Sequence, residues 1–123
     1  MSEDISRLPP QVQERLLRLQ QLQQTLQTVM AQKQQVEMEQ TEVDQSLTEL
    51  QKTAADAVIY KAIGSLLVKA EKAKVTEELA ERKELLTTRS TVLARQEERL
   101  RSQVKEVQTK LQEDLNPVSP PSP

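Results

Sequence analysis

The sequence predicts a mostly α-helical chain, in which two long helices form an antiparallel coiled coil and a central β-hairpin joins them. Two long stretches, residues 12–52 and 70–115, contain neither Gly nor Pro and repeat apolar residues every seven positions. Between them, residues 57–69 hold the only glycine and the only aromatic residue of the chain. Of the 123 residues, 29% are charged and 1% are aromatic, which is typical of long helices and leaves too little bulk for a conventional globular core.

The first helix is expected over residues 9–53, after a flexible N-terminus of residues 1–8. Pro9 and Pro10 suit the first helical turn, where the missing N–H has no partner to lose. The following stretch of about 41 residues corresponds to roughly 60 Å of helix. It carries two heptad rows, and nine of their twelve positions are apolar. The rows are Val12, Leu19, Leu26, Lys33, Gln40 and Leu47, and Arg15, Leu22, Val29, Val36, Val43 and Leu50.

A β-hairpin is expected within residues 57–69, with strands at 58–63 and 66–69. Gly64 and Ser65 lie between two apolar runs, which is typical of a two-residue hairpin turn. The alternative is a helical turn that Gly64 ends. Burying the large side chains of the hairpin would contribute at most about 10–20 kcal/mol, yet the two helices cannot cover both of its faces. Other subunits are therefore expected to complete it.

The second helix is expected over residues 70–115, where Leu79, Leu86, Leu93, Leu100 and Val107 form an unbroken seven-residue repeat. In the preferred antiparallel register, Leu19 faces Val107 and Leu47 faces Leu79. A register shifted by one heptad, with Leu19 facing Leu100, remains open. Residues 116–123 contain four prolines and are expected to be a disordered tail.

Several function classes are not expected. The chain has no Cys and no His, so it lacks disulfides and thiolate metal sites, and it contains no Gly-rich phosphate loop. An enzyme, a metal and a cofactor are therefore not expected. The net charge is −2, and the basic residues near residues 69–83 alternate with Glu and lack aromatic neighbours, which argues against nucleic acid binding. No signal peptide or membrane span is visible, so a cytoplasmic location is expected.

Three segments resemble the β-class subunit of prefoldin, the co-chaperone also called GimC, and favour an archaeal over a eukaryotic source. They are Leu8-Pro9-Pro10-Gln11-Val12-Gln13, residues 59–69 from Ile59 to Lys69, and Arg95-Gln96-Glu97. The resemblance covers about residues 8–115, so residues 9–115 would form a single prefoldin-like domain. It implies a hexamer of two prefoldin α subunits and four β subunits, in which the hairpins build an oligomeric β-barrel. Coiled coils would hang from this barrel, hold non-native client proteins at their tips without ATP, and deliver them to a group II chaperonin.

The resemblance also implies two sets of functional residues. The hairpin would provide the oligomerisation residues Val58, Ile59, Tyr60, Ile63, Gly64, Leu66, Leu67 and Val68. The tips would provide the client-binding residues Val12, Leu16, Leu19, Leu22, Val104, Leu111 and Leu115. The alternative function is a structural or tethering coiled coil without client binding. It would need the same helices, but not an apolar segment between them.

Overall fold

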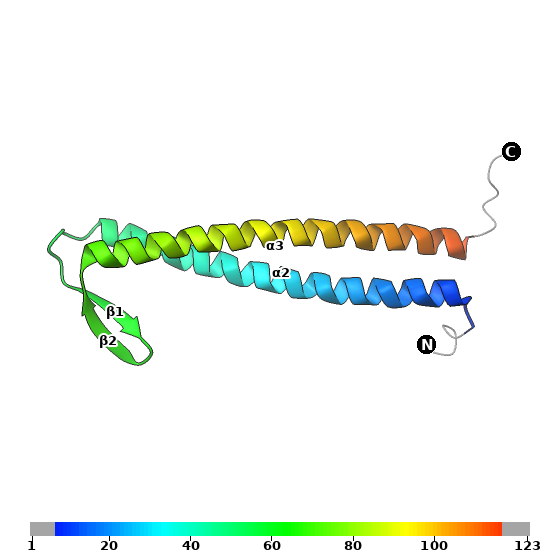
Figure 1. The fold of residues 1–123 in the computed structure, drawn as a ribbon, viewed down its shortest axis with the longest axis horizontal. Helices are drawn as coiled ribbons and strands as arrows, with labels where there is room; N and C mark the ends of the chain where they lie inside the picture. The colour runs from blue at the N-terminus through cyan, green and yellow to red at the C-terminus, as the bar shows by residue number, and fades with distance from the viewer. Residues whose placement is uncertain (1–6, 117–123) are drawn as a thin grey trace. The chain divides into compact units, whose positions relative to one another are not determined.

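The computed structural model describes residues 7–116. Along this part of the chain, one long helix precedes a two-stranded sheet and a second long helix follows it (Figure 1). The elements are α2 (Pro10–Gln51), β1 (Ile59–Ile63), β2 (Leu66–Ala70) and α3 (Lys72–Leu115). The predicted fold class, two long helices joined by an antiparallel hairpin, is confirmed. Of the termini predicted to be flexible, residues 1–6 and 117–123 lie outside the described residues.

The ends of α2 explain why the helix is slightly shorter than the expected 9–53. At the start, the carbonyl of Pro9 accepts hydrogen bonds from the backbone N–H groups of Val12 and Gln13, at 3.0 and 3.1 Å. At the other end, Lys52 and Thr53 bond to the carbonyls three residues earlier, at 3.1 Å each. Such tighter bonds are common in a last helical turn, and they leave Gln51 as the final α-helical residue.

The strands β1 and β2 are antiparallel and joined by the two-residue turn that the sequence predicts. Ile63 pairs with Leu66 beside the turn, and Ile59 pairs with Ala70 at the far end. Gly64 has a φ of 58°, the left-handed conformation that a turn of type II′ requires at its first central position. The alternative of a helical turn ended by Gly64 is therefore wrong. The strand β1 begins one residue later than expected and β2 ends one residue later, while the two bounds beside the turn are as predicted.

The chain divides into two compact units, which we name by what they contain. The terminal unit comprises residues 1–31 and 93–123, and the hairpin unit comprises residues 32–92. Within each unit, a stretch of α2 packs along a stretch of α3 (Figure 1). In the terminal unit, Val12, Val107 and Leu111 form a buried cluster. Partly buried leucines pack against this cluster, namely Leu8, Leu16, Leu19 and Leu22.

Burial follows the heptad rows of the sequence. Eight of the nine buried hydrophobic side chains of the described residues lie in those rows, and the ninth, Leu111, lies in the companion row of the second helix, which is Lys83, Ser90, Glu97, Val104 and Leu111. The predicted coiled-coil seam is therefore confirmed. Leu86 and Val36 are the most completely buried, at 0% and 1% exposed. The remaining seven are Val12, Val29, Val43, Leu50, Leu93, Val107 and Leu111.

Polar contacts across the seam agree with the preferred register in both units. That register places Arg15 opposite Leu111, and the guanidinium of Arg15 contacts Asp114 and the carbonyl of Lys110, which flank this position. In the hairpin unit the same register places Lys83 opposite Val43, and Lys83 forms an ion pair of 2.9 Å with the neighbouring Asp44. The shifted register would move each of these partners by two helical turns.

Candidate functional site

The hairpin is the most exposed apolar segment of the described residues. Six of their twelve exposed large hydrophobic side chains fall between residues 58 and 68, with exposed fractions from 43% to 74%. Leu67 is the most exposed of all. Ile59 is half-buried and Gly64 is exposed. The six exposed side chains are Val58, Tyr60, Ile63, Leu66, Leu67 and Val68.

Both faces of the hairpin carry apolar side chains. Directly paired residues of an antiparallel sheet lie on the same face, so the strand register assigns each side chain to one face. Neither strand shows the strict alternation of apolar and polar residues that a sheet with one solvated face would have. One face holds Ile59, Lys61, Ile63, Leu66, Val68 and Ala70, and the other holds Tyr60, Ala62, Leu67 and Lys69.

A single ion pair links the strand β1 to the start of α3. The ammonium of Lys61 donates a hydrogen bond of 2.6 Å to the Glu78 carboxylate. This bond, with a smaller contribution from the charge of Lys74, lowers the pKa of Glu78. The pair lies in a depression of about 530 Å³ between the hairpin and α3. Ala70 and Val75 also line this depression. The hairpin is thus held against α3 at its base, while its turn end remains uncovered.

Three basic residues in the first turns of α3 make contacts within the chain, namely Lys72, Arg82 and Lys83. Lys72 donates a hydrogen bond of 2.7 Å to the carbonyl of Thr53, just after the end of α2. Arg82 and Lys83 form ion pairs of 2.9 Å with Glu39 and Asp44 of α2. These contacts join the α3 helix to α2 and to the residues just after it, and they account for Lys72, Arg82 and Lys83 without an external ligand.

Residues 7–116 offer little for other chemistries. No group of three or more acidic side chains within them is arranged to hold a metal ion. None of the helices in this part of the chain is both long enough and apolar enough to cross a membrane.

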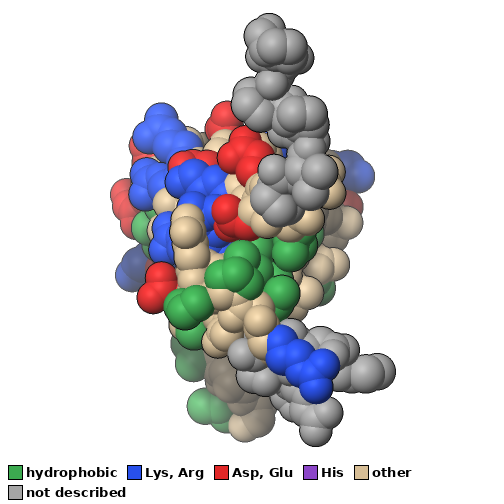
Figure 2. Space-filling view, turned by 90° about the vertical axis from the view of Figure 1, so that its right-hand side faces the viewer, with side chains coloured by type: hydrophobic (Ala, Val, Ile, Leu, Met, Phe, Trp, Pro, Cys, Tyr) green, Lys and Arg blue, Asp and Glu red, His purple; other side chains and the backbone are tan. Residues whose placement is uncertain are grey.

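The structure places the predicted client-binding residues at the end where α2 begins and α3 ends, but most of them are packed. Val12 and Leu111 are 4% and 6% exposed, within the buried cluster. Leu115, at 56%, is the only one of the seven that is exposed. Figure 2 views this end and shows hydrophobic side chains gathered beside acidic and basic ones. The half-buried members are Leu16, Leu19, Leu22 and Val104.

Two apolar residues at this end were missed by the sequence argument. Leu17 is 57% exposed and therefore adds to the accessible apolar surface of the terminal unit. Leu8 packs against the buried cluster from just before the helix start. An apolar residue immediately before a helix often packs onto its first turns, and this position was a signal available in the sequence.

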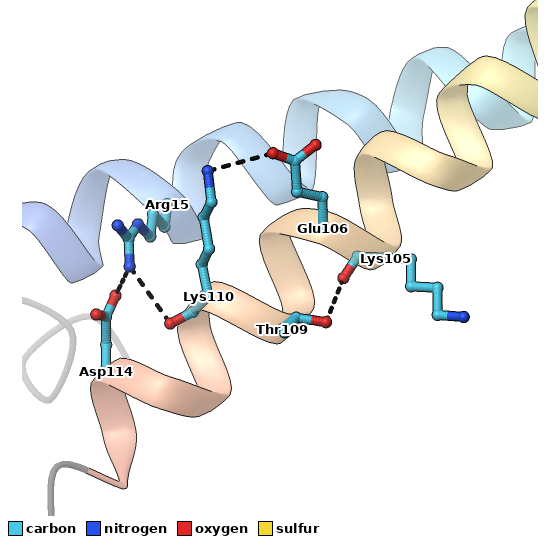
Figure 3. Close-up of polar contacts among 6 residues, drawn as sticks. All are labelled: Arg15, Lys105, Glu106, Thr109, Lys110 and Asp114. Carbon is cyan, nitrogen blue, oxygen red and sulfur yellow. Dashed lines mark hydrogen bonds and ion pairs between the residues drawn. The ribbon is translucent and has the colours of Figure 1, made fainter. Parts of the chain in front are cut away.

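A polar contact holds the two helices together beside the cluster (Figure 3). The guanidinium of Arg15 on α2 is paired with the carboxylate of Asp114 on α3, and it also donates to the Lys110 carbonyl at 3.3 Å. The side chains of Arg15 and Asp114 are 24% and 22% exposed. The sequence indicated only that Arg15 interrupts an apolar heptad row.

Comparison with known proteins gives a consistent picture. A family model described as prefoldin subunit matches residues 13–117. The curated prefoldin subunit beta of Archaeoglobus fulgidus is 49% identical over 110 residues, which cover 89% of this chain and 95% of the relative. The corresponding protein of Thermococcus onnurineus is 46% identical over 112 residues, covering 91% and 97%.

The solved structures agree with the sequence relatives. The crystal structure of the prefoldin beta subunit from Thermococcus strain KS-1 superposes with a TM-score of 0.80 at 42% identity, covering 94% of this chain and 98% of that one. The relatives are archaeal β subunits, as the sequence resemblance predicted. The same family assignment supports the prediction that the chain is a non-enzymatic chaperone component. The chain therefore belongs to the prefoldin subunit family, within which it is similar to archaeal β subunits.

Proposed function

We propose that this chain is a subunit of an ATP-independent holdase, which captures non-native polypeptides at the end of its helix pair and delivers them to a group II chaperonin. The single observation that carries the proposal is the exposed apolar hairpin. It lies in the chain between two helices that bury their own apolar heptad rows against each other. A simple tethering coiled coil has no need of such a hairpin. The family assignment adds independent support.

The hairpin is the proposed assembly element, through the eight residues that the resemblance assigned to oligomerisation. An isolated two-stranded sheet is marginally stable in water and leaves both edges unpaired. Pairing with the hairpins of other subunits in a closed barrel would remove those edges. Apolar residues on both faces, such as Leu66 and Leu67, fit an element that neighbours cover on two sides. The proposed assembly contains two prefoldin α subunits and four copies of this chain.

The terminal unit is the proposed client-binding site. Helix ends without neighbours open locally at a low free-energy cost, and here such opening would uncover Val12 and Leu111 in addition to Leu17 and Leu115, which are already exposed. Apolar contacts are non-directional, so they suit clients that share no sequence. Several weakly binding arms on one client would add avidity.

The test combines assembly and activity. The mass of the chain alone, and of the chain mixed with an α subunit, would be measured by light scattering. The mixture would then be assayed for suppressing aggregation of a chemically denatured protein without ATP. A hexamer that suppresses aggregation supports the proposal. A monomer or dimer that ignores the α subunit and leaves aggregation unchanged would instead support a tethering coiled coil.

A further inference from the structure

At its terminal end, the helix pair is held by an ion pair in addition to the apolar packing of its seam. Arg15 occupies the heptad row whose later members include the buried Val29 and Val36. Its guanidinium contacts both the Asp114 carboxylate and the Lys110 carbonyl, so it binds the last turns of α3 at two points (Figure 3).

This contact is better shielded from water than an ordinary surface ion pair. Arg15 and Asp114 are each less than a quarter exposed, whereas Lys83 and Asp44, which also pair across the helices, are 53% and 54% exposed. Shielding strengthens an ion pair and reduces its screening by salt. The Arg15–Asp114 pair is thus well placed to hold the end of α3 on α2.

The same two turns carry the apolar residues that matter for a client. Leu111 and Leu115 flank Asp114 on α3, and Val12 lies one turn before Arg15 on α2. While the pair is formed, Val12 and Leu111 are buried together with Val107 in one apolar cluster. Moving the last turns of α3 away from α2 would break the ion pair and expose both side chains together.

We propose that the Arg15–Asp114 pair is a latch that sets how often the buried apolar residues of the terminal unit become available to an extended apolar segment of an unfolded polypeptide. The inference rests on the proposed function, because it assigns a regulating contact to the proposed client-binding site. With the latch closed, Leu17 and Leu115 are exposed to a client, whereas Val12, Val107 and Leu111 are buried. With the latch open, the client also meets Val12, Val107 and Leu111.

The latch is tested by hydrogen exchange on the full chain assembled with its α subunit. Arg15→Glu places two carboxylates together and should speed amide exchange in residues 10–20 and 104–115 by roughly three- to tenfold. Asp114→Arg, added to Arg15→Glu, rebuilds the pair in the opposite sense and should restore slow exchange. Glu106→Gln is the matched control, since it removes an exposed ion pair with Lys110 that lies within α3 alone. It should leave exchange unchanged.

The client arm measures binding of the same assemblies to a chemically denatured protein. Arg15→Glu should bind about threefold tighter than the unmodified chain, and the double variant should return to the original affinity. Unchanged exchange in Arg15→Glu would overturn the latch itself. Faster exchange without tighter binding would overturn its role in client access. If the unmodified assembly captures no client, the proposed function fails, and with it the client part of this inference.

Discussion

Lys61 on β1 and Glu78 on α3 form a hydrogen-bonded ion pair with 2.6 Å between the ammonium nitrogen and the carboxylate oxygen. Seventeen residues separate them in sequence, and the contact joins the hairpin to the helix that follows it. The side chains remain 46% and 42% exposed. The pair therefore orients the hairpin base while leaving the apolar turn end uncovered.

The ion pair predicts a pH dependence of the hairpin. The hydrogen bond from Lys61 lowers the pKa of Glu78 in the folded chain, so its stabilising effect is present above the unfolded pKa and is lost as pH falls through the lowered folded pKa. A carboxyl titration by NMR should show the pKa of Glu78 rising towards its ordinary value in Lys61→Gln. Lys69→Gln, which removes another lysine from the same depression, is the control and should leave it unchanged. An identical titration curve in Lys61→Gln would contradict the assigned cause.

Leu86 is the best test of the seam in the hairpin unit. It is 0% exposed, so Leu86→Ala should lower the free energy of unfolding by about 2–5 kcal/mol through lost burial and the cavity left behind. Leu85 is the adjacent residue and is 54% exposed, so Leu85→Ala should cost less than about 1 kcal/mol. Urea unfolding at a fixed protein concentration measures both. Equal losses in the two variants would contradict the observed packing.

Gly64 is predicted to matter for its backbone and not for space. Its φ of 58° is strained for most residues, yet no heavy atom lies within 4 Å of the position where a Cβ would stand. Gly64→Val should therefore destabilise the hairpin by about 1–3 kcal/mol, and Gly64→Asn by less, since Asn tolerates the left-handed region. Chemical shifts of the strand residues in the isolated chain would report the loss. A well-formed hairpin in Gly64→Val would rule out this requirement.

The long-range pattern of the fold could be predicted from the sequence because the coiled coil repeats one simple rule. Heptad spacing identified the residues that became buried, from Val12 to Leu111, since burial in a two-helix seam depends mainly on period. The hairpin was predictable because Gly64, the only glycine, lies with Ser65 between two apolar runs. The strand ends moved by one residue, because pairing of Ile59 with Ala70 depends on the partner strand rather than on local preference.

The candidate site was harder to predict because exposure depends on what the other helix covers. Val12 and Leu111 were assigned to client binding for their place near the termini, yet the periodicity that made them noticeable also packs them into the seam. Leu17 was missed because it lies off that period. The Arg15–Asp114 pair could not be found without a fixed register, since the two residues are 99 positions apart.

Leu67 is the residue at which the proposed role of the hairpin in subunit assembly can be tested. Leu67 is 74% exposed, so Leu67→Asp should leave the helices of the isolated chain intact by circular dichroism while placing a charge in the proposed barrel. Leu85→Asp introduces the same charge at an exposed position outside the hairpin and serves as the control.

The deciding measurement is the mass, by light scattering, of each variant mixed with the α subunit. We predict a hexamer for the unmodified chain and for Leu85→Asp, and separate subunits for Leu67→Asp. A hexamer of unchanged mass with Leu67→Asp would contradict the assignment of the hairpin as the assembly element.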